Sequence, residues 1–168
     1  MARSPDSGSP DSWLDQLVSD GIVALPGRSN TEARDSLMEA ARTSLVDATR
    51  DPGRSPGGII RDTENAVRQA ISALAAHHGT RFVGSNKHAA VVRFAEAHPG
   101  FDDGSVDKID QIRLARNAGM YGDRHEDTPI EYSAADAEHL AKAGASVVSR
   151  VTTLLNAGRP IPPPPASG

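Results

Sequence analysis

The residues of this sequence whose types and spacing could do chemistry lie between Arg113 and Tyr121. Arg113, Asn117 and Tyr121 are four residues apart, so they share one ridge of a predicted helix. Arg116 falls instead on the apolar stripe of that helix, close to the direction of Ile112. An unpaired guanidinium is costly to bury and cannot lose its proton. Arg116 therefore either pairs with an internal carboxylate or faces a groove or a subunit interface.

Two guanidinium groups, an amide and a phenol near one helix end are suited to binding a phosphodiester. An arginine can donate two hydrogen bonds to a phosphate, and Asn117 can orient the arginines or contact a base or ribose. The alternative is a structural network in which both arginines pair with acidic residues of neighbouring helices. The spacing alone favours this structural network somewhat, and it leaves both interpretations open.

A second group of candidates consists of basic residues elsewhere in the chain. Lys87 and His88 begin a predicted helix, and His125 follows Tyr121 in a predicted loop, where it is either a solvated residue or folds back toward the helix. The chain has no Cys, and none of its six His residues has metal-motif spacing, so we predict no metal and no cofactor. Segment 54–58 is turn-rich, but no Gly-Lys-Ser/Thr follows it, so it is not a phosphate-binding loop.

The elements that must position these residues are helices. Apolar residues recur at intervals of three and four, and capping residues and Gly or Pro stops separate the resulting segments. The predicted helices cover approximately residues 12–20, 31–49, 58–78, 86–98, 105–120 and 133–157. The last begins with a capping box from Ser133 to Asp136. No convincing strand is present, so the fold class is all-α, an antiparallel four- to five-helix up-and-down bundle with disordered termini.

Composition limits the domain organisation and the partners. A chain of 168 residues fits one domain, with a disordered N-terminus at 1–11, a helical bundle at 12–158 and a Pro-rich tail at 159–168. The net charge of −4 provides no global basic field, so nucleic acid would have to bind a local patch. No segment resembles a signal peptide or a membrane span, and we therefore expect a cytoplasmic protein without membrane contact.

Several short motifs, taken in order, resemble a known family. They are Arg116-Asn117, Tyr121-Gly122-Asp123, Ser133-Ala134-Ala135-Asp136-Ala137, and upstream Ala73-Leu74 with Gly79, Ser85-Asn86-Lys87-His88 and Val91-Val92-Arg93-Phe94. Over about residues 32–155 the chain resembles the HEPN superfamily, and it is similar to the small HEPN proteins encoded beside minimal nucleotidyltransferases. The resemblance implies a dimeric helical bundle, a nucleotidyltransferase-type antitoxin as partner, and an effector that contacts RNA or a nucleotide.

The resemblance also implies roles for individual residues. Active members are metal-independent ribonucleases of toxin–antitoxin or defence systems, so Arg116, Asn117 and Tyr121 are the implied catalytic residues. The residues expected to contact substrate are Arg113, His125, Lys87 and His88. Tyr121 stands where active members carry a His, and a tyrosine is a poor base near neutral pH. The open alternatives are a non-catalytic HEPN module for dimerisation or partner binding, and a helical adaptor unrelated to nucleic acid.

Overall fold

The computed structural model describes residues 12–25, 30–51, 53–121 and 131–157, without the side chains of residues 119–121. Six helices lie within these ranges: α1 (Ser12–Ser19), α2 (Thr31–Thr49), α3 (Pro56–His77), α4 (Lys87–Ala97), α5 (Asp103–Tyr121) and α6 (Ala134–Ala157). The predicted all-α fold is therefore confirmed. The termini that we expected to be disordered lie outside the described residues. None of the described helices combines the length and the apolar character needed to cross a membrane.

The helix boundaries follow the capping residues closely. The predicted capping box is present, because the Ser133 and Asp136 backbone N–H groups donate to each other's side chains over 3.0 and 3.1 Å. The N-terminal end of α3 differs slightly from the prediction, since it begins at Pro56 rather than Gly58. Ser55 caps this end by accepting a hydrogen bond from the Gly58 backbone N–H. A proline is well tolerated there because the first turn of a helix needs no donor from it.

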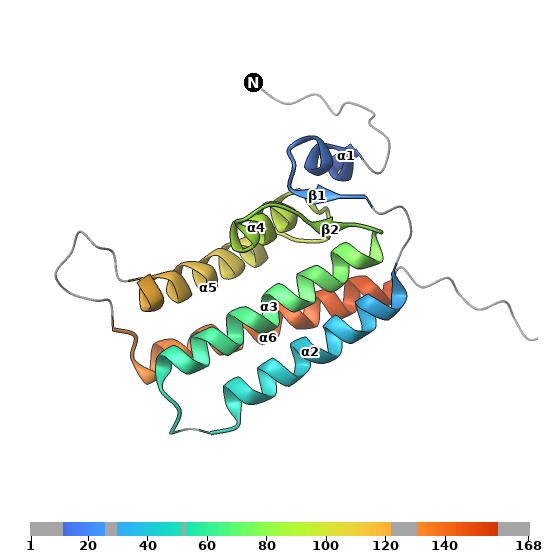
Figure 1. The fold of residues 1–168 in the computed structure, drawn as a ribbon. Coiled ribbons are helices and arrows are strands. Elements are labelled where there is room, and N and C mark those ends of the chain that lie inside the picture. Colours follow the sequence, from blue (N-terminus) through green and yellow to red (C-terminus); the bar gives the residue numbers. More distant parts are fainter. Residues whose placement is uncertain (1–11, 26–29, 52, 122–130, 158–168) are drawn as a thin grey trace, which may run out of the picture.

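One short antiparallel sheet was missed by the sequence analysis. Strand β1 (Val23–Ala24) pairs with β2 (Arg81–Phe82), with Val23 opposite Phe82. Two residues per strand are too few to produce a recognisable alternation of apolar and polar side chains. The pairing connects the segment after α1 to the link between α3 and α4 (Figure 1).

Helix α3 occupies the centre of the bundle and packs against α2, α4, α5 and α6. The colours in Figure 1 show that α2 and α5 run in one direction, whereas α3 and α6 run in the other. The four long helices thus alternate in direction along the chain, which is the predicted up-and-down arrangement. The short α4 lies beside one end of α5, with α1 and the small sheet next to it (Figure 1).

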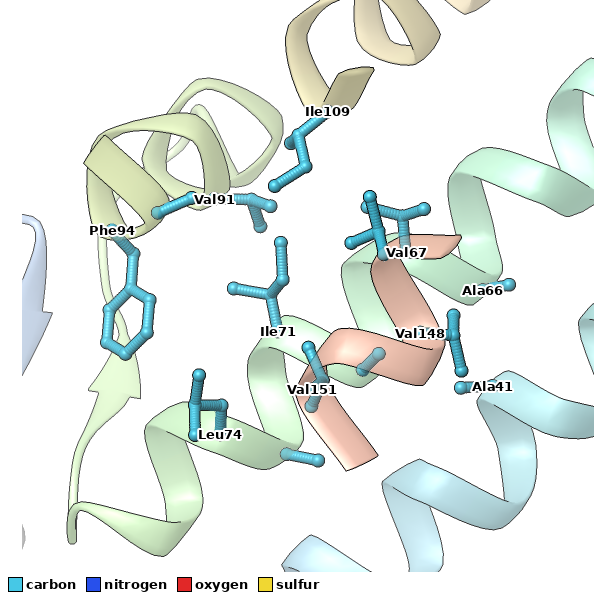
Figure 2. Packing of buried hydrophobic residues seen from close by; sticks show 14 of the residues in the cluster. Ala41, Ala66, Val67, Ile71, Leu74, Val91, Phe94, Ile109, Val148 and Val151 are labelled. Atoms are coloured by element: carbon cyan, nitrogen blue, oxygen red, sulfur yellow. The ribbon is translucent and has the colours of Figure 1, made fainter. Parts of the chain in front are cut away.

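The hydrophobic core surrounds α3. Small alanines on this helix, among them Ala66 and Ala70, have no exposed surface and allow its neighbours to approach closely. Figure 2 shows the larger side chains that meet there, including Val67, Ile71 and Leu74 of α3, Phe94 of α4, Ile109 of α5 and Val151 of α6. The core therefore fixes α4 and α5 against α3, and these are the helices that carry the candidate site.

Gly144 of α6 marks a close approach between α6 and α3. A Cβ atom added at Gly144 would overlap Cγ2 of Thr63, a fully buried residue of α3. The Thr63 hydroxyl donates to the Ile59 carbonyl oxygen over 2.8 Å, which orients the methyl group. The two helices consequently leave no room for a side chain at this position.

The Gly144→Ala variant is expected to lower the free energy of unfolding by about 1–3 kcal/mol, measured by chemical denaturation. This cost of overpacking exceeds the gain of about 1 kcal/mol that alanine brings to a helix interior. Adding Thr63→Ser, which keeps the hydroxyl and removes Cγ2, should restore most of the loss. Gly104→Ala in the first turn of α5 is the control, because its Cβ would come no closer than 3.6 Å to Asp102. Unchanged stability in Gly144→Ala would contradict this account.

Candidate functional site

Arg116 is paired with an internal carboxylate, which is one of the two environments that the sequence allowed. Its Nε atom lies 3.3 Å from Oε2 of Glu64, and its Nη1 atom lies 3.1 Å from Nε2 of His88. The Glu64 side chain is only 6% exposed and that of Arg116 is 17% exposed. Neither Nε of Arg116 nor Oε2 of Glu64 has a hydrogen-bond partner among the described residues, so this contact is electrostatic.

His88 connects the two charged groups. Its Nδ1 atom lies 2.5 Å from Oε1 of Glu64. Because an ionised carboxylate can only accept, we assign the proton to Nδ1, which leaves the lone pair of Nε2 to accept from Arg116. A carboxylate bound to one imidazole nitrogen, with a lone pair on the other, is the arrangement of a general base, and here Arg116 occupies that lone pair.

Three helices bring this group together, which we call the Glu64 triad (Glu64, His88 and Arg116). Glu64 lies in the N-terminal half of α3, His88 in the first turn of α4 and Arg116 in the C-terminal half of α5. The start of α4 is fixed by Asn86, whose side chain accepts a hydrogen bond from the Ala89 backbone N–H over 3.1 Å. The triad is therefore held on rigid elements rather than on loops.

Arg116 also lines a cavity of about 650 Å³, which we call the Arg116 cavity. Its wall consists of residues 54–58 and 60–61 around the start of α3, Ala115 and Arg116 of α5, and Glu131 and Tyr132 before α6. The turn-rich segment 54–58 lacks the sequence of a phosphate-binding loop, yet it contributes backbone from a helix N-terminus to this wall. Helix N-termini attract anions through the helix dipole, although at this one Pro56 has no N–H group and the Gly58 N–H already donates to Ser55.

Three arginines line the Arg116 cavity, and carboxylates hold them in place. Asp62 lies 2.5 Å from Nη1 of Arg54 and 3.4 Å from Nε of Arg61, and Glu64 pairs with Arg116. Glu131 is a further acidic residue of the wall. An anionic ligand would therefore compete with carboxylates for these guanidinium groups. Each guanidinium has five donors, so pairing with a carboxylate does not exhaust it.

The other residues predicted on α5 are not at this cavity. Arg113 donates from Nε and Nη2 to Oδ1 of Asp110, over 2.9 and 2.7 Å, so its carboxylate partner lies on α5 itself rather than on a neighbouring helix. Asn117 is half-buried, and neither it nor Arg113 belongs to the described wall of the Arg116 cavity. Of the residues predicted on α5, Arg116 lines this cavity, whereas Arg113 and Asn117 on the adjacent ridge do not.

The remaining predicted residues fall into two groups. Lys87 lines a second cavity, on the other side of the Glu64 triad, while the neighbouring His88 joins the triad itself. The side chain of Tyr121 and the whole of His125 lie outside the described residues, and their expected roles stay predictions.

Glu64 is the functional candidate that sequence reasoning missed. It is an acidic residue within a stretch of α3 whose neighbours Thr63, Ala66 and Val67 are buried. A charged residue in such a stretch is a signal, because carboxylates are almost never fully buried without a partner. Arg54, Arg61 and Tyr132 gave no comparable signal, since they join the cavity only through the packing of distant segments.

A separate cluster of aromatic and histidine rings docks α1. His98 is only 7% exposed, and its ring centroid lies 4.8 Å from that of Trp13. Burial, together with the nearby His78 and Arg150, lowers the pKa of His98 to about 4, so this imidazole is neutral at physiological pH. Its Nδ1 accepts a hydrogen bond from the Gly100 backbone N–H over 2.9 Å. We assign this cluster to packing rather than chemistry.

Comparisons of the chain with protein-family models, with curated proteins and with solved structures found no match. Among the residues that the structure describes, no group of three or more acidic or histidine side chains is arranged to hold a metal ion.

Proposed function

We propose that the Arg116 cavity binds a phosphodiester of RNA and that the protein is a metal-independent ribonuclease, acting as an effector of the HEPN type. One observation carries the proposal. Arg116 lines an arginine-rich cavity and lies 3.1 Å from the proton-accepting nitrogen of His88, whose other nitrogen is bound to buried Glu64. A phosphate-binding group and an oriented base thus lie side by side, as cleavage of RNA by its own 2′-hydroxyl requires.

The reaction follows from these positions. A bound phosphate attracts the Arg116 guanidinium, which frees Nε2 of His88 to accept the proton of the 2′-hydroxyl. The 2′-oxygen then attacks phosphorus and the bond to the 5′-oxygen breaks, giving a 2′,3′-cyclic phosphate and a 5′-hydroxyl. The leaving oxygen takes its proton from the Tyr132 hydroxyl or from water. Arg116 and Arg54 stabilise the additional charge on the phosphorane. The base therefore comes from α4, rather than from position 121 as the resemblance implied.

The Arg116→Ala variant is expected to reduce both RNA binding and cleavage, the cleavage by about 10²-fold or more. The measurement uses end-labelled RNA in excess chelator and identifies the 2′,3′-cyclic phosphate in the products. Arg116→Lys should recover only part of the activity, because an ammonium group cannot bind phosphate in a bidentate manner. Arg50→Ala, at a side chain that is 72% exposed, is the matched control and should behave as wild type. Cleavage that does not depend on Arg116 would reject the proposal.

RNA binding without cleavage would favour a second candidate, a non-catalytic module for dimerisation or partner binding. One observation supports this candidate. Leu114 of α5 is 51% exposed and borders a mainly apolar groove with Leu140 of α6, next to the Arg116 cavity. Such a surface suits a second copy of the chain or the nucleotidyltransferase-type antitoxin that the resemblance implies. Sedimentation of the same sample, alone and with that partner, tests whether the chain forms these assemblies, and the cleavage assay decides between the two candidates.

A further inference from the structure

A second cavity, of about 570 Å³, lies beyond the Glu64 triad along α3, and we call it the Arg68 cavity. Its wall includes Arg68 and Ser72 of α3, Arg81 and Phe82 of β2, and Lys87 and Val91 of α4. Three of these side chains are cationic. No carboxylate is found among the described residues that line the cavity, in contrast to the Arg116 cavity.

The cations of the Arg68 cavity are poorly neutralised. Nε of Arg68 is buried and has no hydrogen-bond partner among the described residues, and its Nη2 makes only a long hydrogen bond of 3.4 Å to Asn65. Arg81 and Lys87 are exposed, and neither forms an ion pair within the described part of the chain. A buried guanidinium nitrogen without an acceptor is costly. The cavity is therefore suited to an anion that would supply the missing acceptor.

Much of the rest of the wall is apolar, and it includes an aromatic ring. Phe82 is half-buried, and its ring packs edge-on against Phe94 with the centroids 5.5 Å apart. Val91 of α4 also lies in this wall. Nucleobases that are not paired stack on aromatic side chains, while their phosphates bind to Arg and Lys. The cavity thus combines the two contacts that a nucleoside phosphate needs.

The two cavities flank the Glu64 triad. Ile60, Glu64 and Arg68 are four residues apart and lie on one ridge of α3, with Ile60 at the Arg116 cavity and Arg68 at the other. Glu64 and Arg68 are separated by little more than one helical turn, about 6 Å along the axis. On α4, His88 contacts Glu64 whereas the adjacent Lys87 lines the Arg68 cavity. A ligand that occupies both cavities would pass directly over the triad.

We propose that the Arg68 cavity holds the nucleotide next to the one whose phosphate binds Arg116, so that the substrate is single-stranded RNA lying along this ridge of α3. This inference rests on the proposed function. The strand must be single because a base can reach Phe82 only when it is unpaired and unstacked. Arg81 and Lys87 bind its backbone, and Phe82 stacks on its base.

The test measures binding of a fluorescent, single-stranded, 2′-O-methylated RNA oligonucleotide, which cannot be cleaved by internal attack. Arg81→Ala and Lys87→Ala should each reduce the steepness with which the logarithm of the association constant falls with the logarithm of the salt concentration. The expected reduction in this slope is about 0.7, the value for one lost phosphate contact to a single strand. Phe82→Leu should weaken binding about 5- to 100-fold, as expected for one lost base stack. Arg50→Ala and Lys142→Ala remove exposed cations at the C-terminal end of α2 and on α6 that line neither cavity, and they should leave binding unchanged.

The outcomes separate this inference from the proposed function. If Arg116→Ala abolishes binding while Arg81→Ala, Lys87→Ala and Phe82→Leu bind normally, the inference is rejected and the proposed function stands. If adenosine monophosphate binds in an Arg81-dependent way and the oligonucleotide does not, the cavity holds a free nucleotide and the inference also fails. If the wild-type protein binds no RNA, both fail. If these three variants lose as much affinity for the corresponding RNA duplex as for the single strand, the inference of a single-stranded substrate is likewise rejected.

Discussion

The His88→Asn variant is expected to lose RNA cleavage by a factor of about 10²–10⁴ while it binds RNA as tightly as the wild-type protein. Asparagine places an amide N–H where the imidazole has Nδ1–H, so the hydrogen bond to Glu64 survives. It offers no counterpart to Nε2, the atom that we propose as the base. The substitution therefore removes the proposed base, together with the hydrogen bond that Nε2 accepts from Arg116, and it retains the hydrogen bond to Glu64.

Single-turnover cleavage rates and anisotropy titrations, both in excess chelator, measure these two quantities separately. His77→Asn is the control for losing a histidine, since His77, the last residue of α3, does not belong to the described wall of either cavity. Unchanged cleavage in His88→Asn would show that the base lies elsewhere, and His125 would become the next candidate.

Much of the fold could be predicted because local signals define helices. The apolar spacing and the caps, such as Asn30 and Ser133, depend on neighbours within one or two turns, and the structure reproduces them. The exception is the sheet of β1 and β2, whose pairing joins residues about 58 positions apart and has no local signature. Local sequence patterns therefore predict the helices, whereas contacts between distant parts of the chain determine which side chains those helices bring together.

The same distinction explains what was missed in the site. The apolar stripe of α5 indicated that Arg116 either pairs with an internal carboxylate or faces a groove or interface. The chain has 22 acidic residues, and spacing cannot select the partner among them. Only the packing of α5 against α3 identifies Glu64. The resemblance also directed the search for a base to the residues after Arg116. His88 precedes Arg116 by 28 positions and reaches it only because α4 and α5 pack together.

Glu64→Ala is expected to cause the largest loss of stability among the variants considered, about 3–5 kcal/mol in the free energy of unfolding. The loss does not measure an attractive bond alone. It arises because the guanidinium of Arg116 and the Nδ1–H of His88 would stay buried without their acceptor. Chemical denaturation at neutral pH measures the effect.

A second ion pair of this chain has the same N···O distance as Arg116 and Glu64 but is exposed, so comparing the two pairs shows the effect of burial alone. Lys142 and Glu138 of α6 also approach to 3.3 Å, but their side chains are 76% and 70% exposed. Glu138→Ala should therefore cost no more than about 0.5 kcal/mol, since water solvates the remaining ammonium group. Combining Glu64→Leu with Arg116→Met should recover most of the loss, because replacing a buried pair with apolar residues of similar volume is often neutral. Equal losses at Glu64 and Glu138, or no recovery in the double variant, would show that burial does not govern the energy of the triad.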